Sequence, residues 1–229
     1  MKIAIMQPYI FPYIAYFQLI AAVDKFIFLD NVNFIKKGWI NRNRLCDDFS
    51  FTIPCVNISQ NKYISETEID WQNTMINKLI KTIEMKYSQA KYFSQVFEII
   101  NGVFASKAKH ISNLAMRSIR AFAEYFNLAT EFAVASESKQ YSTDLKGSHR
   151  LIDILQKERA SIYINAIGGM QLYSKQEFAS SGIELKFLKT TLTENFAKDD
   201  YVSFYSIIDV AMHNSPDRIG ELIKNYELI

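Results

Sequence analysis

Short apolar segments that are typical of strands alternate with longer segments that are typical of helices along most of this chain. Residues 3–6 and 26–29 are rich in β-forming residues, and the apolar stretch at 13–23 between them indicates a buried helix. Parallel strands need long crossover connections, which helices usually provide. The alternation therefore predicts an α/β fold with a mostly parallel, Rossmann-like sheet.

A helical stretch separates the two halves of this pattern. Residues 71–127 contain three segments with apolar residues at helical spacing, which predict a helical subdomain, or lid, inserted into the sheet domain. In chain order, the other expected elements are strands at 49–56, 130–135, 161–165 and 184–188 and helices at 145–157, 175–180, 203–213 and 217–227. No linker or repeat divides the chain, so we expect residues 1–229 to form a single α/β domain.

The composition excludes several classes of protein. The chain has 229 residues, 49% of them apolar, with only seven Gly and four Pro, so it can build a sizeable core and is unlike disordered or fibrous chains. Its two cysteines and three histidines show neither metal-binding nor disulfide-framework spacing, so we expect no metal site. The longest apolar run, at 10–23, is interrupted by Pro12 and is too short to span a bilayer, and we expect a cytoplasmic protein.

Positive charge is concentrated at the start of the chain. Residues 1–46 carry six basic and two acidic residues, a net charge of +4, whereas the whole chain has a net charge of +2. A local excess of this size suits a small molecule with phosphate or carboxylate groups, because duplex DNA requires a longer basic stripe. We therefore expect a small anionic ligand and no duplex nucleic acid.

The first candidate site is the segment 7–16, which follows the first predicted strand. Ligands of open α/β sheets bind outside the carboxyl ends of the strands, where this segment lies. Its candidate binding residues combine a stiff backbone with hydroxyl and amide groups, and they are Gln7, Pro8, Tyr9, Pro12, Tyr13 and Tyr16. The alternative is a rigid turn that packs its aromatic rings into the core.

The second candidate site is the segment 30–44, which follows the second predicted strand. Its candidate binding residues are Lys36, Trp39, Asn41, Arg42, Asn43 and Arg44. In an extended segment Arg42 and Arg44 share one face, where two guanidinium groups could bind phosphate or carboxylate, while Trp39 could stack on a sugar or a base. The alternative is a solvated strand edge in which one arginine forms a salt bridge.

Two further candidates lie in the C-terminal half. Gly168 and Gly169 follow a predicted strand and precede a predicted helix, so they could bring the backbone close to an anionic ligand, although an ordinary turn has the same sequence. Asp209 and His213 are four residues apart on one predicted helical face, where the carboxylate could orient the imidazole as a base. The alternative is a histidine that ends the helix.

Familiar catalytic motifs are missing from the sequence or altered in it. There is no Gly-x-Ser-x-Gly element, Walker loop or dinucleotide fingerprint, so the sequence identifies no cofactor. Residues 12–16 are similar in spacing to the Pro-x-His-x-Gly-His element of Rossmann-like nucleotidyltransferases, but Tyr13 and Tyr16 stand where histidines would be. A tyrosine can donate a hydrogen bond to a phosphate but carries no positive charge, which argues against nucleotidyl transfer by that route.

Two N-terminal stretches, residues 5–20 and 24–44, resemble the WbqC-like family, which is met in bacterial gene clusters for O-antigen and other surface polysaccharides. Weaker similarity follows at 163–173 and 206–214. By position, the resemblance implies these shared motif residues: Gln7, Pro8, Tyr9, Pro12, Tyr16, Asp30, Lys36, Trp39, Asn41, Arg42, Asn43 and Asp209. This chain departs from the family at Ala15, where Gly is usual, and at Asn33, where Gln is usual.

The resemblance implies a transferase of surface-polysaccharide biosynthesis, since a glycine transferase role has been suggested for members of the family. In this hypothesis a glycyl or other small acyl group is transferred to the amine of a nucleotide-linked amino sugar. ATP, an acyl carrier or an aminoacyl-tRNA could supply the activated donor. The pyrophosphate would be bound by Lys36, Arg42 and Arg44, and the base would be Asp30 or the Asp209–His213 pair.

Two alternatives stay open at this point. One is a nucleotidyl- or adenylate-forming enzyme that uses the segment 7–16 and binds ATP or CTP with magnesium. The other is a protein without catalytic activity that binds a glycan or a partner enzyme through its aromatic and asparagine-rich surface.

Overall fold

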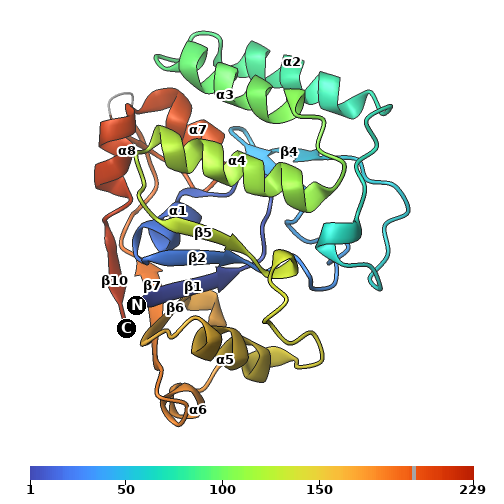
Figure 1. The fold of residues 1–229 in the computed structure, drawn as a ribbon. Helices are drawn as coiled ribbons and strands as arrows, with labels where there is room; N and C mark the ends of the chain where they lie inside the picture. Colours follow the sequence, from blue (N-terminus) through green and yellow to red (C-terminus); the bar gives the residue numbers. More distant parts are fainter. Residues whose placement is uncertain (198–199) are drawn as a thin grey trace.

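A six-stranded sheet forms the centre of the molecule in the computed structural model, which describes residues 1–197 and 200–229 (Figure 1). The strands run in the order β10-β7-β6-β1-β2-β5, and all neighbouring pairs are parallel except β10 with β7. Their bounds are Lys2–Met6 (β1), Lys25–Phe28 (β2), Glu131–Val134 (β5), Ile162–Ala166 (β6), Glu184–Thr190 (β7) and Tyr226–Leu228 (β10). The predicted α/β fold with a mostly parallel, Rossmann-like sheet is confirmed.

The strand order reverses next to β1. The chain moves outward from β1 to β2 and β5, and it then returns to the other side of β1 with β6 and moves outward again to β7 and β10. Connections that leave two neighbouring strands in opposite directions open a crevice between their carboxyl ends, which is where open α/β sheets bind ligands. The carboxyl ends of β1 and β6 therefore define the expected binding edge.

Alternate residues of the strands enter two separate apolar cores. In β1, Ala4 packs into one core and Ile3 and Ile5 into the other, as the period of two in a strand requires. In β2, Phe26 and Phe28 likewise belong to the first core. Both faces of the sheet are thus buried, which explains why the sequences of the central strands β1 and β2 are almost continuously apolar.

Helices cover both faces of the sheet (Figure 1). On the first face lie α1 (Ile14–Ala21), α4 (Ile111–Tyr125), α7 (Ile207–His213) and α8 (Pro216–Leu222), and on the second lie α5 (Gly147–Lys157) and α6 (Lys175–Ala179). The helices α2 (Met75–Tyr87) and α3 (Phe93–Ala105) lie outside α4, farther from the sheet. In the described part of the chain, every helix is too short or too polar to cross a bilayer.

The helical stretch expected at 71–127 contains two kinds of helix. α4 is a covering helix, because Phe122 packs against Phe17 of α1, and Arg120 lies over the rings of Phe28 and Phe132. α2 and α3 extend the same core outward. The connection between β2 and β5 therefore supplies both the crossover helix of the fold and an additional helical layer.

Several elements differ from the sequence-based expectation. The strand expected at 49–56 ends at Thr52 and forms a hairpin of β3 (Arg42–Leu45) and β4 (Phe49–Thr52). The helix expected at 217–227 ends at Leu222, because the last residues pair with β7 as β10. A second hairpin of β8 (Asn195–Ala197) and β9 (Asp200–Val202) was not expected. The helix expected at 203–213 begins at Ile207, with Ser206 as its N-cap.

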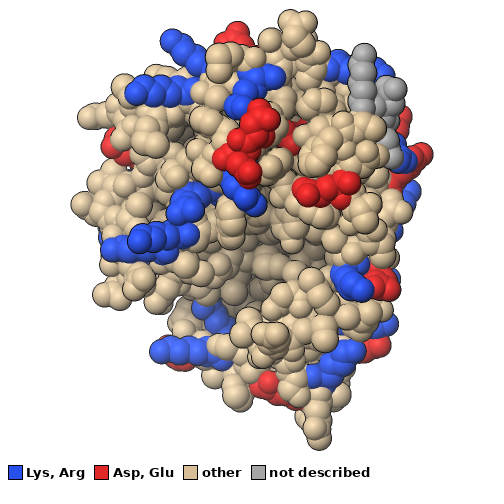
Figure 2. All heavy atoms as spheres, turned by 180° about the vertical axis from the view of Figure 1, so that it is seen from behind, with Lys and Arg blue, Asp and Glu red and all other residues tan. Residues whose placement is uncertain are grey.

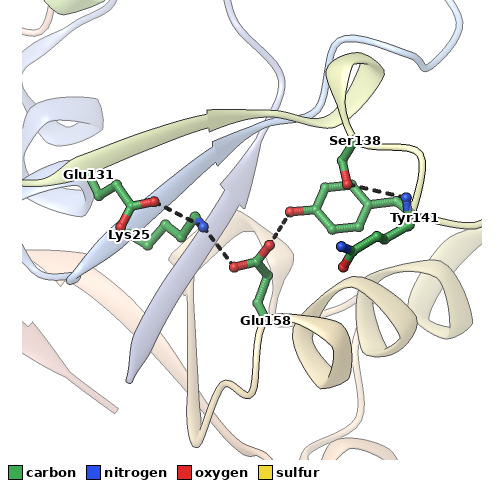
Figure 3. A network of polar contacts seen from close by, with 6 residues as sticks. Lys25, Glu131, Ser138, Tyr141 and Glu158 are labelled. Atoms are coloured by element: carbon green, nitrogen blue, oxygen red, sulfur yellow. Dashed lines mark hydrogen bonds and ion pairs between the residues drawn. The ribbon is translucent and has the colours of Figure 1, made fainter.

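At the amino ends of the strands, here called the amino edge of the sheet, charged side chains form ion pairs (Figure 3). Lys25, the first residue of β2, forms ion pairs with Glu158 at the end of α5 (2.7 Å) and with Glu131 at the start of β5 (3.0 Å). The Tyr141 hydroxyl donates a hydrogen bond to the other oxygen of Glu158. These contacts tie two strands, a helix and a loop together at the edge opposite the expected binding site.

Candidate functional site

A cavity of about 620 Å³ opens at the carboxyl edge of the sheet, at the reversal point. Met6 at the end of β1 and Ala166 at the end of β6 both line it. The rest of the lining comes from the loop after β1, the start of α1, the segment 35–44 and Phe204. The fold thus brings segments that are far apart in sequence around one space, at the edge where ligands of this sheet type bind.

The molecule is hollowed on the face shown in Figure 2, and the surface inside the hollow is almost entirely uncharged. Lysine, arginine and acidic side chains lie around its margin. This distribution agrees with the lining of the cavity, in which Arg44 is the one charged side chain among the described residues.

The loop between β1 and α1 is held in an unusual conformation. Phe11 has a φ of 44°, in the left-handed region that a bulky residue rarely adopts. Its backbone is held from three sides: the N–H donates to the Ser118 hydroxyl (3.1 Å), and the carbonyl accepts from Asn43 and from the Ser206 hydroxyl. Three distant elements therefore fix the cavity loop in one shape, as a preorganised binding site requires.

Three tyrosines of the first candidate segment form one wall of the cavity. Tyr9, Tyr13 and Tyr16 all line it, and the rings of Tyr9 and Tyr16 meet edge to face with centroids 5.4 Å apart. The Tyr9 hydroxyl accepts a hydrogen bond from the Tyr13 backbone, and the Tyr16 hydroxyl donates to the carbonyl of Gln7. Burial raises the pKa of all three phenols, so they stay protonated at neutral pH and can donate hydrogen bonds.

The other residues of the first segment have different positions. Gln7 lines the cavity with a half-buried side chain. Pro8 and Pro12 are buried outside the lining, and the Pro12 carbonyl accepts a hydrogen bond from the backbone of Ile207 (2.7 Å). The prolines thus stiffen the loop, while the glutamine and the tyrosines face the cavity.

The segment 35–44 supplies the wall that carries the positive charge. Trp39, Asn43 and Arg44 line the cavity. The Arg44 guanidinium lies 5.7 Å from the centre of the Trp39 ring and 5.6 Å from that of Tyr205, and it forms an exposed ion pair with Asp48 (3.2 Å). An exposed ion pair of this kind contributes little, so a stronger anion can replace Asp48 as the partner of the arginine.

Asn43 lines the cavity and also determines its shape. Its amide group donates to the carbonyls of Ile10 (3.1 Å) and Phe11, and its own oxygen accepts from the backbone N–H of Arg44 (2.8 Å). One buried side chain therefore connects the loop after β1 with strand β3.

Three expected binding residues of this segment lie outside the cavity lining. Arg42 is half-buried, Lys36 is exposed, and the Asn41 side chain donates a hydrogen bond to the carbonyl of Ile53 (2.8 Å). The expected alternation does not include Trp39, because the chain turns between Trp39 and β3, with the N–H of Arg42 bonded to the carbonyl of Trp39. Within β3, Arg42 and Arg44 lie two residues apart on one face of the strand, as expected. Of the two arginines, the structure brings only Arg44 to the cavity.

The expected catalytic role of Asp30 is not supported by its surroundings. Its side chain is 1% exposed, and its two oxygens accept hydrogen bonds from the backbone and the hydroxyl of Ser136 (3.0 and 2.7 Å). It lies outside the cavity lining. This carboxylate joins the end of β2 to the segment after β5, and it is not placed to take a proton from a ligand in the cavity.

The expected Asp209–His213 dyad does not form. The Asp209 carboxylate is fully buried and accepts hydrogen bonds from the hydroxyls of Tyr87, Tyr201 (2.8 Å) and Ser203 (2.6 Å). Nδ1 of His213 instead contacts the backbone carbonyl of Asp209 (2.8 Å), and its ring stacks on Tyr201. Both residues lie outside the cavity lining, so the pair serves to join α7 to α2 and β9.

The glycines after β6 also lie outside the lining, although the strand end before them contributes to it. A Cβ on Gly169 would come within 2.5 Å of the Asn165 amide nitrogen, so this glycine leaves room for the Asn165 side chain within the turn. Gly168 is exposed and faces open space. The close approach that the glycine pair permits is therefore to a neighbouring side chain.

Some lining residues could not be recognised in the sequence. Phe204 follows β9 and reaches a cavity whose other lining residues, apart from Ala166, lie more than a hundred residues earlier, and no local signal indicates this contact. Ile35 and Ile40 read as ordinary apolar residues. In the residues that the structure describes, no group of three or more His, Cys, Asp or Glu side chains could hold a metal ion.

Comparison with known proteins agrees with the N-terminal motifs. Residues 7–221 match the WbqC-like protein family, and the match includes both segments that line the cavity. The chain belongs to the WbqC-like family. A relative from Mycobacterium tuberculosis (strain H37Rv), the uncharacterized protein Rv1507c, is 26% identical over 189 residues, which cover 80% of each chain. No solved structure matches.

The structure shows where the two departures from the family pattern, Ala15 and Asn33, lie relative to the cavity. Ala15, where the sequence resemblance implies a glycine, lines the cavity in the first turn of α1, so its methyl group forms part of the cavity wall. Asn33 is exposed and pairs with Tyr63 in an isolated bridge, outside the lining. The first departure therefore alters the cavity wall, whereas the second alters a surface contact.

Proposed function

We propose that this chain is a transferase of bacterial surface-polysaccharide biosynthesis that attaches a glycyl or other small acyl group to the amine of a nucleotide-linked amino sugar. The observation that carries the proposal is the cavity at the reversal point of the sheet, with three tyrosines, Trp39 and Arg44 in its walls. Its volume of about 620 Å³ lies within the range of small-molecule sites. Membership of the WbqC-like family supports the same conclusion.

The lining suits a sugar better than it suits a highly charged group. Neither the hydroxyl of Tyr13 nor the side-chain amide of Gln7 forms a hydrogen bond within the described structure. Both groups are therefore available to the hydroxyl and amine groups of a sugar. The indole of Trp39 offers a flat apolar surface for stacking on a ring. Arg44 would then bind the phosphate groups that link the sugar to its nucleotide.

The proposed reaction forms an amide bond. The amine nitrogen of the sugar attacks the carbonyl carbon of the activated acyl group, the C–N bond forms, and the bond from that carbon to the leaving group breaks with its electron pair. The nitrogen then loses a proton to water. An unprotonated amine is a good nucleophile, so holding it beside the acyl carbon can supply much of the rate.

The titratable groups of the lining fit this type of reaction. The pKa values of Tyr9, Tyr13 and Tyr16 are raised by burial, so these phenols act as hydrogen-bond donors and not as bases at neutral pH. The buried carboxylates of Asp30 and Asp209 are hydrogen-bonded elsewhere. We therefore propose that the protein binds and orients the amine in its neutral form, and that no carboxylate of the described lining removes its proton.

A thermal-shift comparison tests the proposal. Ligand at about one hundred times its Kd adds about 2.7 kcal/mol of apparent stability, which raises the midpoint of a chain of this size by about 5 to 10 °C. We expect this increase with UDP-glucosamine and much less with free glucosamine. Arg44→Ala should remove most of the increase, whereas the matched variant Arg42→Ala, two residues earlier on the same strand and outside the lining, should keep it.

Other outcomes would favour the alternatives. An equal increase with free glucosamine, kept in Arg44→Ala, would support a glycan-binding protein. An increase with ATP or CTP and magnesium, and none with UDP-glucosamine, would support nucleotidyl transfer. Either result would contradict the proposed substrate class.

A further inference from the structure

Exposed apolar side chains are concentrated on two short segments next to the cavity. The described chain has 14 large apolar side chains that are exposed, and five of them lie in residues 35–39 and 167–172. These are Ile35, Trp39, Ile167, Met170 and Leu172. The first segment contributes to the lining, and the second continues directly from Ala166, which also lines the cavity. Apolar surface that gathers around the rim of one site marks an interaction surface.

The segment 35–39 contains a well-defined turn. Residues 35–38 form a tight turn, closed by a hydrogen bond from the Gly38 N–H to the Ile35 carbonyl (3.0 Å), with Lys37 at a φ of 62°. A Cβ at position 38 would lie only 3.0 Å from atoms of Ile35, so glycine allows the close approach within this turn. The two corner positions are Lys36 and Lys37, and the flanking side chains, Ile35 and Trp39, are 51% and 52% exposed.

The lysines of this turn carry charge that their surroundings do not compensate. Neither Lys36 nor Lys37 has an acidic partner among the described residues. The acidic residues that follow β3 are engaged elsewhere, Asp47 with Lys86 and Asp48 with Arg44. The rim of the cavity therefore presents two free ammonium groups beside exposed aliphatic and indole side chains.

We propose that the rim of the cavity, formed by residues 35–39 and 167–172, binds the surface of an anionic lipid membrane. Tryptophan prefers the boundary between headgroups and acyl chains, and lysines can extend to anionic headgroups while neighbouring apolar groups enter the bilayer. Adjacent basic and apolar residues on a turn match this surface in both charge and polarity. The cavity would then open toward the membrane, independently of which substrate it holds.

Vesicle flotation with the full chain tests this proposal. We expect the protein to float with vesicles of phosphatidylcholine and phosphatidylglycerol, and to remain unbound with phosphatidylcholine alone. The double variant Lys36→Glu, Lys37→Glu should reduce binding by about tenfold or more, because each lysine near an anionic surface contributes to the attraction. A matched double variant on α2, Lys78→Glu with Lys81→Glu, makes the same change in net charge and should bind as the wild type does.

Tryptophan fluorescence tests the apolar part separately. Insertion of Trp39 should shift the emission to shorter wavelength when anionic vesicles are added, and Trp39→Phe should remove this shift while leaving the signal of Trp71. High salt should weaken binding, because the lysines are exposed. Thermal midpoints equal to that of the wild type would show that the variants are folded.

Three outcomes would overturn the proposal. Absence of flotation of the wild type with either vesicle would leave the rim as a surface for another protein. Equal flotation of the Lys36, Lys37 variant and the α2 control would show that binding comes from another face. A Trp39 emission that does not respond to vesicles would remove the apolar contribution. None of these results depends on a substrate, so they are separable from the thermal-shift test of the proposed function.

Discussion

The two edges of the central sheet are stabilised in different ways. At the amino edge, Lys25 forms ion pairs with Glu131 and Glu158, and the neutral Tyr141 hydroxyl donates a hydrogen bond to Glu158 (Figure 3). Around the cavity at the carboxyl edge, uncharged groups hold the loops, with Asn43 bonded to the carbonyls of Ile10 and Phe11. Charged groups thus make the structural contacts at the amino edge, whereas neutral groups make them in the cavity wall.

The two edges therefore differ in whether their charged residues stabilise the fold or are placed to bind a ligand. Charged groups that are paired and partly buried hold elements together and cannot easily exchange partners. A cavity framed by neutral amide and hydroxyl groups keeps its shape without Arg44, whose exposed ion pair with Asp48 can be exchanged for a contact with a ligand. Substitutions at the amino edge should therefore change stability, whereas substitution of Arg44 should change binding alone.

The largest effect is expected from Asn43→Ala. This change leaves the Ile10 carbonyl and the Arg44 N–H without their partner in a buried place and releases the strained Phe11 turn. We expect a loss of about 3 kcal/mol in the free energy of unfolding, measured with urea. Asn113→Ala, an exposed substitution on α4, is the matched control and should change stability by less than about 0.5 kcal/mol. Equal values for the two variants would show that Asn43 does not hold the cavity loop.

The next largest effect is expected from Lys25→Met, which keeps the side-chain stem and removes the charge. Glu158, only 19% exposed, would lose its cationic partner. We expect a loss of about 2 kcal/mol, measured in the same urea titration. Lys189→Met is the control, because Lys189 and Glu227 form an ion pair that is about half exposed, and its loss should change stability little. A Lys25 variant as stable as this control would mean that the amino edge is not held by charge.

The same network should make stability depend on pH. Burial alone would raise the pKa of Glu158, but the hydrogen bonds from Lys25 and Tyr141 outweigh it and lower the pKa below its ordinary value of 4.5. The stabilisation is therefore complete above pH 4.5 and is lost as the pH falls through the lower, folded-state pKa. Unfolding free energies measured from neutral pH to about pH 3 should fall less steeply in Lys25→Met than in the wild type.

A second carboxylate, Asp153, serves as the internal reference for the comparison of wild type with Lys25→Met. Asp153 also has a lowered pKa, because hydrogen bonds from Lys157 and from the Ser142 backbone outweigh the effect of burial. Its contribution should be the same in both proteins, so only the difference between the two curves reports on Glu158. Parallel curves would contradict the assignment of the acid dependence to the Lys25 network.

Much of the fold could be predicted because the apolar residues of its main elements recur at helix or strand spacing. The β1–α1–β2 unit and the helices of the middle segment have continuous or amphipathic apolar patterns. The short strands could not be predicted in the same way. β10 has three residues and exists because it pairs with Leu188, Lys189 and Thr190 of β7, a partner that the local sequence does not reveal. Short strands depend on pairing more than on propensity.

The candidate site could be located from the sequence but not assembled in detail. The rule that ligands bind at the carboxyl ends of strands correctly brought the segments 7–16 and 30–44 together. The choice between Arg42 and Arg44 could not be made from the sequence, because both lie in β3 two residues apart and only Arg44 reaches the cavity lining. Asp209 was a catalytic candidate because it lies four residues before His213 on one predicted helical face, but in the structure it accepts hydrogen bonds from three hydroxyl groups, which that spacing does not reveal.

The smallest effect on stability is expected from Arg44→Ala, the variant that should have the largest effect on ligand binding. The arginine side chain is 45% exposed and its partner Asp48 is 71% exposed, and such pairs contribute between about 0 and 1 kcal/mol because water and salt screen them. We expect the free energy of unfolding, measured with urea, to change by no more than about 0.5 kcal/mol, far less than in Lys25→Met. A loss equal to that of Lys25→Met would mean that the cation at the carboxyl edge is structural as well, and Arg44 would then no longer be free to bind a phosphate.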